Sequence, residues 1–186
     1  MTVPTTDPRY LEMFPAWLGS LGTDAAALGT IVTGDGPEPV RRYVVAGLNY
    51  VFKSLDLIPD GIDDLGFLDD AFVLRVAAAL AVVDHPVALL AEAPEAEVLK
   101  RLAHDAGAVK DFLGEDYPRL EGYVKSLRNG AARGRTVDDI MTDAGVRAAF
   151  AGEVLAWSQG FEAPSFTRDP KTLIKLKAFL GAKLPS

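Results

Sequence analysis

The sequence predicts a single all-α domain, a helical array of seven to nine helices with a helix-turn-helix hairpin at its centre. Three observations support this fold class. Hydrophobic residues make up 49% of the chain and recur at helical spacing. Prolines and glycines separate the periodic segments, and no segment alternates between apolar and polar residues as a half-buried strand would. Since 186 residues are enough for one hydrophobic core, residues 1–186 are expected to form one domain.

The first helices are expected within residues 7–34. Asp7-Pro8 is typical of a helix start, because proline suits the first helical position. Pro15 is expected to kink or end this helix. Thr23 or Asp24 is then expected to cap a second helix, which stops at the glycines that follow.

The central hairpin is expected from residues 39–55 and 68–84. In the first segment, apolar residues cover most of the helix circumference, which is typical of a buried helix. In the second, apolar residues form a stripe at i, i+4, i+8, i+11 and i+15, beginning at Leu68. Asp69 and Asp70 fall in its first turn, where carboxylates interact favourably with the helix dipole.

Two helices are expected in the middle of the chain. Pro94 opens a strongly amphipathic segment that ends at Gly114, and Pro118 opens the next one. The second of these ends at Asn129-Gly130, and residues 131–135 form a short basic linker.

The remaining helices are marked by capping residues. Thr136 and Asp139 have the spacing of a capping box, so a helix is expected to begin there. Residues 160–168 are expected to form a loop, and Asp169-Pro170 to cap the last helix.

The most unusual stretch joins the two central helices. Residues 56–70 contain six aspartates and no Lys or Arg, yet the apolar residues among them are expected to be buried. An unpaired buried carboxylate is costly, so the aspartates need a counter-charge. Arg75 is the only Lys or Arg in residues 54–99, and a guanidinium in an apolar helix needs an anion. We therefore predict a structural ion pair between Arg75 and Asp56 or Asp60.

The alternative is a divalent cation site. Asp56 and Asp60 leave the first central helix, while Asp69 and Asp70 enter the second, so a tight turn would bring four carboxylates together. Carboxylate oxygens are the ligands that Mg²⁺ and Ca²⁺ prefer, and these two ions are the candidate cofactors. The spacing is not that of an EF-hand. The ion pair is the favoured hypothesis, and it alone places Arg75 among the aspartates.

The same stretch resembles a known family. The segments that carry the resemblance are Leu55-Asp56-Leu57-Ile58-Pro59-Asp60, Ile62 and Leu65-Gly66-Phe67-Leu68-Asp69-Asp70. They resemble the signature of domain of unknown function family 1232, the YkvA-like family, over about residues 43–82. The departures are Gly61, Asp63 and Asp64, which stand where that family usually has an apolar residue, a proline and another apolar residue. The family has no established biochemical activity, so the resemblance implies the helix-turn-helix arrangement, and it implies membrane association for some members.

Two function hypotheses follow. The favoured one is a non-catalytic helical scaffold or interaction protein with an ion-paired aspartate-rich turn, which binds a protein partner or a second copy of itself. The alternative is a divalent-metal-dependent enzyme acting on a phosphate-bearing or lipidic small molecule, with Asp56, Asp60, Asp69 and Asp70 as metal ligands. The sequence contains no cysteine and only two histidines, and we assign no catalytic residue.

Charge and hydropathy limit the partners and the location. A net charge of −7 argues against a general nucleic-acid binder. The lysines of the last helix could meet anionic lipid, but a solvated helix face is the favoured interpretation. These lysines are Lys171, Lys175, Lys177 and Lys183. No membrane span and no secretory leader are expected, and a cytoplasmic location follows.

Overall fold

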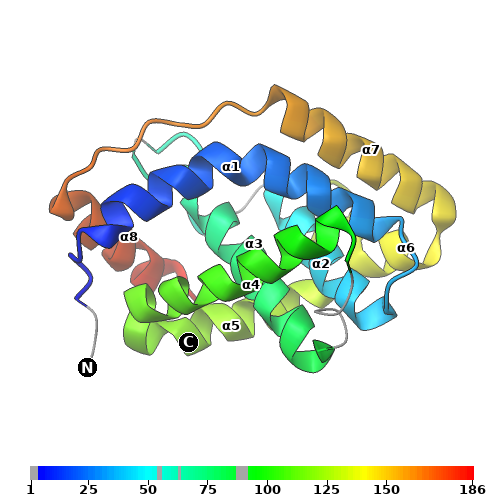
Figure 1. Ribbon diagram of the computed structural model, residues 1–186, viewed down its shortest axis with the longest axis horizontal. Helices are drawn as coiled ribbons and strands as arrows, with labels where there is room; N and C mark the ends of the chain where they lie inside the picture. Colours follow the sequence, from blue (N-terminus) through cyan, green and yellow to red (C-terminus); the bar gives the residue numbers. More distant parts are fainter. Residues whose placement is uncertain (1–3, 54–55, 63, 87–91) are drawn as a thin grey trace.

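The computed structural model describes residues 4–53, 56–62, 64–86 and 92–186, and Figure 1 shows their arrangement. The all-α fold is confirmed. The α-helices are α1 (Arg9–Val32), α2 (Glu38–Val51), α3 (Leu68–Asp84), α4 (Pro94–Leu113), α5 (Tyr117–Ser126), α6 (Val137–Thr142), α7 (Ala144–Gly160) and α8 (Pro170–Lys183). The short elements are the 3-10 helices η2 (Gly114–Asp116) and η3 (Leu127–Asn129) and the strands β1 (Ala131–Ala132) and β2 (Arg135–Thr136).

Helix α3 is the centre of the molecule. From Leu68 to Ala81 every residue except the half-buried Ala79 is buried. Helices α2 and α4 pack along α3, and α1 crosses above them with α7 alongside it (Figure 1). A helix enclosed in this way has no polar face, which explains why α3 is apolar almost all round. The predicted central hairpin is therefore α2 and α3, although α2 ends at Val51 and residues 54 and 55 lie outside the described residues.

Aromatic rings join α1, α3 and α4 in the core. Phe14 of α1 lies 5.1 Å from Phe72 of α3 and 5.0 Å from Phe112 of α4, measured between ring centroids. Both pairs have the edge-to-face geometry that favours aromatic contacts. Tyr10 and Trp17 extend this cluster along α1.

The prediction of two helices in the N-terminal region is wrong, because residues 9–32 form the single helix α1, which contains Pro15. Asp24 does not cap a new helix. Its carboxylate is buried, accepts a hydrogen bond from the Ser20 hydroxyl at 2.9 Å and forms an ion pair with Arg101 of α4. A tertiary ion pair thus uses the side chain that local sequence suggested as a cap.

The other helix boundaries follow their sequence signals. Thr136 and Asp139 form the predicted capping box at α6, and the Asp169 side chain accepts a hydrogen bond from the Lys171 N–H at α8. The linker at 131–135 differs from expectation, because it is a small hairpin in which β1 and β2 pair antiparallel. Its turn is Arg133-Gly134, where both residues have positive φ, 50° and 76°.

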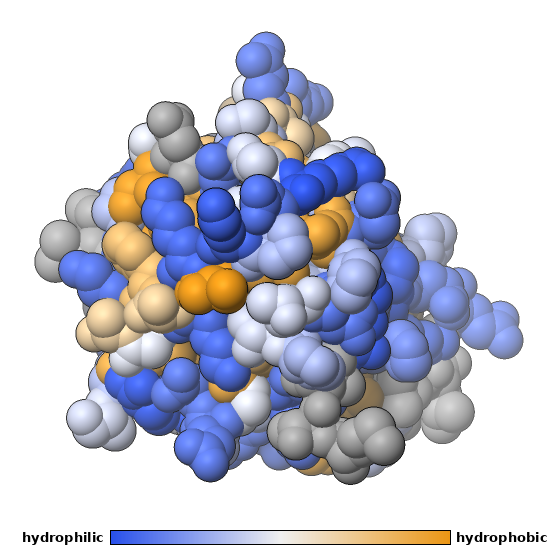
Figure 2. All heavy atoms as spheres, turned by 90° about the vertical axis from the view of Figure 1, so that its left-hand side faces the viewer, coloured by the Kyte–Doolittle hydropathy of each residue, from blue (hydrophilic) through white to orange (hydrophobic). Residues whose placement is uncertain are grey.

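Helix α8 lies at one end of the molecule beside the start of α1 (Figure 1). Figure 2 shows this end, where hydrophobic residues are scattered among hydrophilic ones. On α8 itself, Lys171, Lys175 and Lys183 are exposed, whereas Lys177 donates a hydrogen bond to the Thr5 hydroxyl. Among the described residues, no helix has both the length and the apolar character needed to cross a membrane.

Candidate functional site

Asp69 holds together the corner between α2 and α3. Its Oδ2 accepts hydrogen bonds from the Tyr50 hydroxyl at 2.5 Å and from the Ile58 backbone N–H at 3.1 Å. The Tyr50 oxygen also accepts a hydrogen bond from the Leu57 backbone N–H at 2.7 Å. All of these groups are buried, so the bonds replace water for each polar atom and connect the end of α2, the turn and the start of α3.

The chain closes tightly around this corner. A Cβ atom on Gly66 would lie 2.3 Å from the backbone carbonyl oxygen of Asp60, so only glycine fits there. Phe67 follows with a φ of 65° and precedes α3. The Asp64 carboxylate accepts hydrogen bonds from the N–H and the hydroxyl of Thr167, at 3.0 Å and 2.7 Å. The turn is therefore also attached to the segment between α7 and α8.

We use the name acidic corner for Asp56, Asp60, Asp69 and Asp70. Asp69 and Asp70 are 0% and 1% exposed, Asp56 is half-buried and Asp60 is exposed. Four buried oxygens, Oδ1 of Asp56, Oδ1 of Asp69 and both oxygens of Asp70, have no hydrogen-bond partner among the described residues. Buried carboxylate oxygens without partners are unusual in a folded protein.

The four carboxylates of the acidic corner influence one another. Burial, followed by the charges of the other three, raises the pKa of Asp70 well above its usual value. Burial and then Asp69 and Asp60 raise the pKa of Asp56 to about 7, against the opposing effect of Lys53. Burial also raises the pKa of Asp60. Burial raises the pKa of Asp69 as well, although the hydrogen bonds that its carboxylate accepts from Tyr50 and Ile58 lower this pKa. In the acidic corner the carboxyl groups are therefore more stable when their negative charge is neutralised, by a proton or by a bound cation, than when they are ionised and unpaired.

The structure brings the four predicted aspartates into one neighbourhood, but their side chains are not arranged as a finished metal site. Among the described residues, no three His, Asp or Glu side chains are placed to hold a metal ion together.

The predicted ion pair of Arg75 with Asp56 or Asp60 is wrong. The Arg75 side chain is fully buried, and its Nε lies 3.3 Å from Oδ2 of Asp105 on α4. Five residues along α3 separate Arg75 from Asp70, and this spacing turns a side chain by about 140° around the helix axis. Arg75 therefore faces α1 and α4, whereas the acidic corner lies toward the end of α2.

The surroundings of Arg75 explain how its charge is accommodated. The guanidinium carbon lies 3.9 Å from the centre of the Trp17 ring, and Nη1 donates a hydrogen bond to the Ala71 carbonyl at 3.0 Å. Burial lowers the pKa of Arg75 to about 10, while the charges of Asp105 and Asp24 oppose this. Arg75 thus has a cation–π contact and an ion pair of its own, separate from the acidic corner.

Sequence reasoning missed Tyr50 and Asp105. A tyrosine in a buried helix needs a hydrogen-bond partner for its hydroxyl, and this signal could have identified Tyr50. Asp105 carried no such signal, because its role depends on how α4 packs against α3.

Comparison of the chain with protein-family models, with curated proteins and with solved structures finds no match.

Proposed function

We propose that this protein is a non-catalytic helical binding protein whose acidic corner takes up a divalent cation. The observation that carries the proposal is the set of four buried carboxylate oxygens without a hydrogen-bond partner among the described residues. Arg75 is paired with Asp105 and does not neutralise the acidic corner, so we propose a bound cation as its counter-charge. Mg²⁺ and Ca²⁺ suit this role because both bind carboxylate oxygens.

Binding requires a change of side-chain position. Asp69 and Asp70 are fixed on α3 inside the core, whereas Asp56 and Asp60 lie on the turn, where Asp56 is half-buried and Asp60 is exposed. In the proposal, Asp56 and Asp60 rotate toward Asp70, and the cation replaces the protons that the raised pKa values favour. Lys53, whose charge lowers the pKa of Asp56, donates a hydrogen bond to the Tyr123 hydroxyl.

Two pockets lined by described residues lie away from the acidic corner, so neither of them supplies it with a space for a substrate. A pocket of about 210 Å³ is lined by the 30–40 region and by the start of α4. Another, of about 500 Å³, lies between α5 and the C-terminal residues Pro185 and Ser186.

Membership of the YkvA-like family and a cytoplasmic location belong to the same proposal. The resemblance covers residues 43–82, which include most of α2, the acidic corner and most of α3. This coincidence with a helix-turn-helix unit supports the proposed family membership. The absence of cysteine suits a reducing compartment.

The test is a metal titration followed by calorimetry and by thermal unfolding. Mg²⁺, Ca²⁺ and Mn²⁺ at millimolar concentration are expected to raise the melting temperature of the wild-type chain. In Asp70→Asn the metal-dependent rise should disappear, and the metal-free melting temperature should increase, because a neutral amide avoids the cost of burying a carboxyl group whose pKa is raised. Asp35→Asn, which removes one exposed carboxylate elsewhere, should behave like the wild type. An absence of heat and of any thermal shift with all three metals would refute cation binding.

A further inference from the structure

A pocket of about 210 Å³ lies where the end of α1, the loop at 33–37 and the start of α4 meet. Its apolar floor belongs to the core, because Val40, Ala96 and Leu99 line the pocket and are buried. An apolar cavity of about 150 Å³ is enough to hold benzene, so this pocket has room for one aromatic ring and a short chain. The size and the lining suit a small organic molecule.

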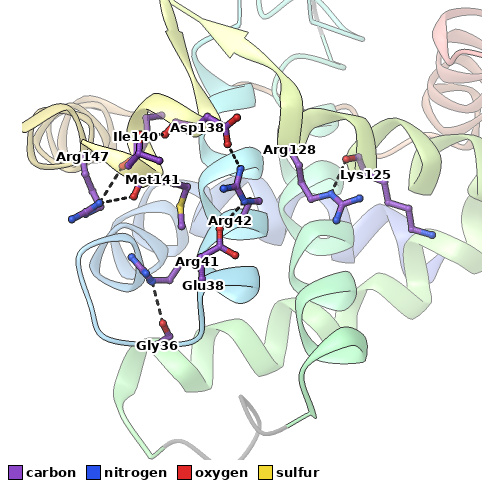
Figure 3. A network of polar contacts seen from close by, with 11 residues as sticks. Gly36, Glu38, Arg41, Arg42, Lys125, Arg128, Asp138, Ile140, Met141 and Arg147 are labelled. Carbon is purple, nitrogen blue, oxygen red and sulfur yellow. Dashed lines mark hydrogen bonds and ion pairs between the residues drawn. The ribbon is translucent and has the colours of Figure 1, made fainter. Parts of the chain in front are cut away.

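The loop on one side of the pocket is held by hydrogen bonds. The Gly34 N–H donates to the Ile31 carbonyl at 3.2 Å, and Arg41 donates from Nε to the Gly36 carbonyl at 3.1 Å (Figure 3). Because Ile31, Gly34 and Gly36 line the pocket, these bonds hold its wall in position. A wall that is already ordered loses little entropy when a ligand binds.

Two carboxylates also line the pocket, Asp35 from the loop and Glu95 from the first turn of α4. Asp35 is exposed and Glu95 is half-buried, so both lie at the rim in contact with water. Among the described residues they are the only charged side chains of the lining, and neither of them has a hydrogen bond or an ion pair. Both carboxylates are therefore available to a ligand.

The charges around the pocket are negative in sum. Residues 30–42 and 92–100 contain five Asp or Glu against three Lys or Arg. Glu38 pairs with Arg42 at 2.8 Å and Glu97 with Lys100 at 2.9 Å, so these two acids already have a counter-charge. Opposing charge comes from Arg41, which does not line the pocket, and from the ends of three helices. Since α1 ends where α2 and α4 begin, the helix ends sum to about half a positive charge, against two full negative charges in the lining.

We infer that this pocket binds a small organic amine whose apolar part is about the size of one aromatic ring. The ring covers the apolar floor and leaves water, which is the main source of affinity. The protonated amine lies at the rim, where Asp35 and Glu95 accept charge-assisted hydrogen bonds from it. A carboxylate-bearing molecule of the same size is repelled there, so the rim selects cations. This site is separate from the acidic corner, and the inference does not depend on metal binding there.

The test is a titration followed by ligand-detected saturation-transfer NMR, with phenethylamine as the probe. Phenethylamine has about nine non-hydrogen atoms, and a dissociation constant of about 1 mM or below is expected for a ligand of this size. The ring protons should receive more saturation than the methylene beside the nitrogen, because the ring lies inside the pocket. The neutral phenethyl alcohol should bind about tenfold more weakly, and the anionic hydrocinnamate should not bind.

Two variants separate the apolar floor from the charged rim. Ala96→Leu fills part of the pocket and should weaken the binding of both the amine and the alcohol by about tenfold or more. Asp35→Ser combined with Glu95→Gln should weaken only the binding of the amine, by about tenfold. The matched control, Glu115→Gln combined with Glu162→Gln, removes two exposed carboxylates from other parts of the chain and should keep the wild-type affinities.

A further control excludes binding of the amine at the acidic corner, because Asp70→Asn should leave its affinity unchanged. If Ala96→Leu does not fold, the rim variant alone still tests the inference. The inference would be overturned by the absence of saturation transfer to all three probes, by equal affinities for the amine and the alcohol, or by tighter binding of hydrocinnamate. An equal loss of amine binding in the rim variant and in either control would overturn it as well.

Discussion

Substitutions of Arg75 separate the packing role of this side chain from the role of its charge. Arg75 is 0% exposed, rests on Trp17 and lies among apolar residues of α3. Its Nε and Nη2 have no hydrogen-bond partner among the described residues, even though Nε is 3.3 Å from Asp105. The guanidinium therefore lacks part of the hydrogen bonding that would offset its loss of water, while its bulk fills the core.

The expected magnitudes follow from this environment. Arg75→Ala leaves a cavity beneath Trp17 and should reduce the free energy of unfolding by about 3–4 kcal/mol, within the range for large-to-alanine changes in cores. Arg75→Met keeps most of the volume and removes the buried charge, so it should lie within about 1 kcal/mol of the wild type. The Asp105 side chain, 22% exposed, reaches water and is not stranded in either variant.

Urea unfolding followed by far-UV circular dichroism measures both free energies. Equal slopes with denaturant show that the variants unfold from comparable native states. A third variant, Asp105→Asn, leaves the fully buried Arg75 guanidinium without its carboxylate and should cost about 3 kcal/mol, the low end of the range for breaking a buried pair, because Asp105 itself is partly solvated. A loss for Arg75→Met as large as that for Arg75→Ala would refute the reasoning, since the charge and not the packing would then be essential.

Three further predictions concern the acidic corner. Tyr50→Phe should reduce the free energy of unfolding by about 1–3 kcal/mol, because it leaves the buried Leu57 N–H without its acceptor; Tyr123→Phe, at a half-buried hydroxyl, is the control and should cost less. Gly66→Ala should lower the melting temperature far more than Gly61→Ala, because a Cβ meets the Asp60 carbonyl at 2.3 Å only in the first case; similar effects would contradict the tight closure of the turn. The pKa of Asp56 is about 4 in the unfolded chain and about 7 in the folded protein, so between these pH values the folded state holds more protons. In the presence of EDTA the free energy of unfolding should therefore fall as the pH rises from about 4 through about 7. Urea unfolding at pH 5 and pH 8 measures this slope, which should flatten in Asp56→Asn; a slope of opposite sign would show that these carboxyls are not stabilised in the protonated form.

The sequence by itself determined the fold class and many helix boundaries. Proline at the start of α4 and the capping box of Thr136 and Asp139 act within one helical turn, so local sequence is enough to read them. The apolar stripe that begins at Leu68 likewise predicted a buried α3. The clustering of aspartates at the corner was also visible, because all four lie within fifteen consecutive residues.

Only the tertiary structure decided which charges meet. Asp105 is thirty residues from Arg75 in the sequence, and their contact depends on the packing of α4 against α3. The packing of α4 against α1 brings Arg101 to Asp24, a residue that lies within the continuous helix α1 and does not cap a second helix. Ion pairs and buried hydrogen bonds depend on distances of a few ångströms between elements, and hydrophobic periodicity fixes which face of a helix is buried but not which side chain it meets.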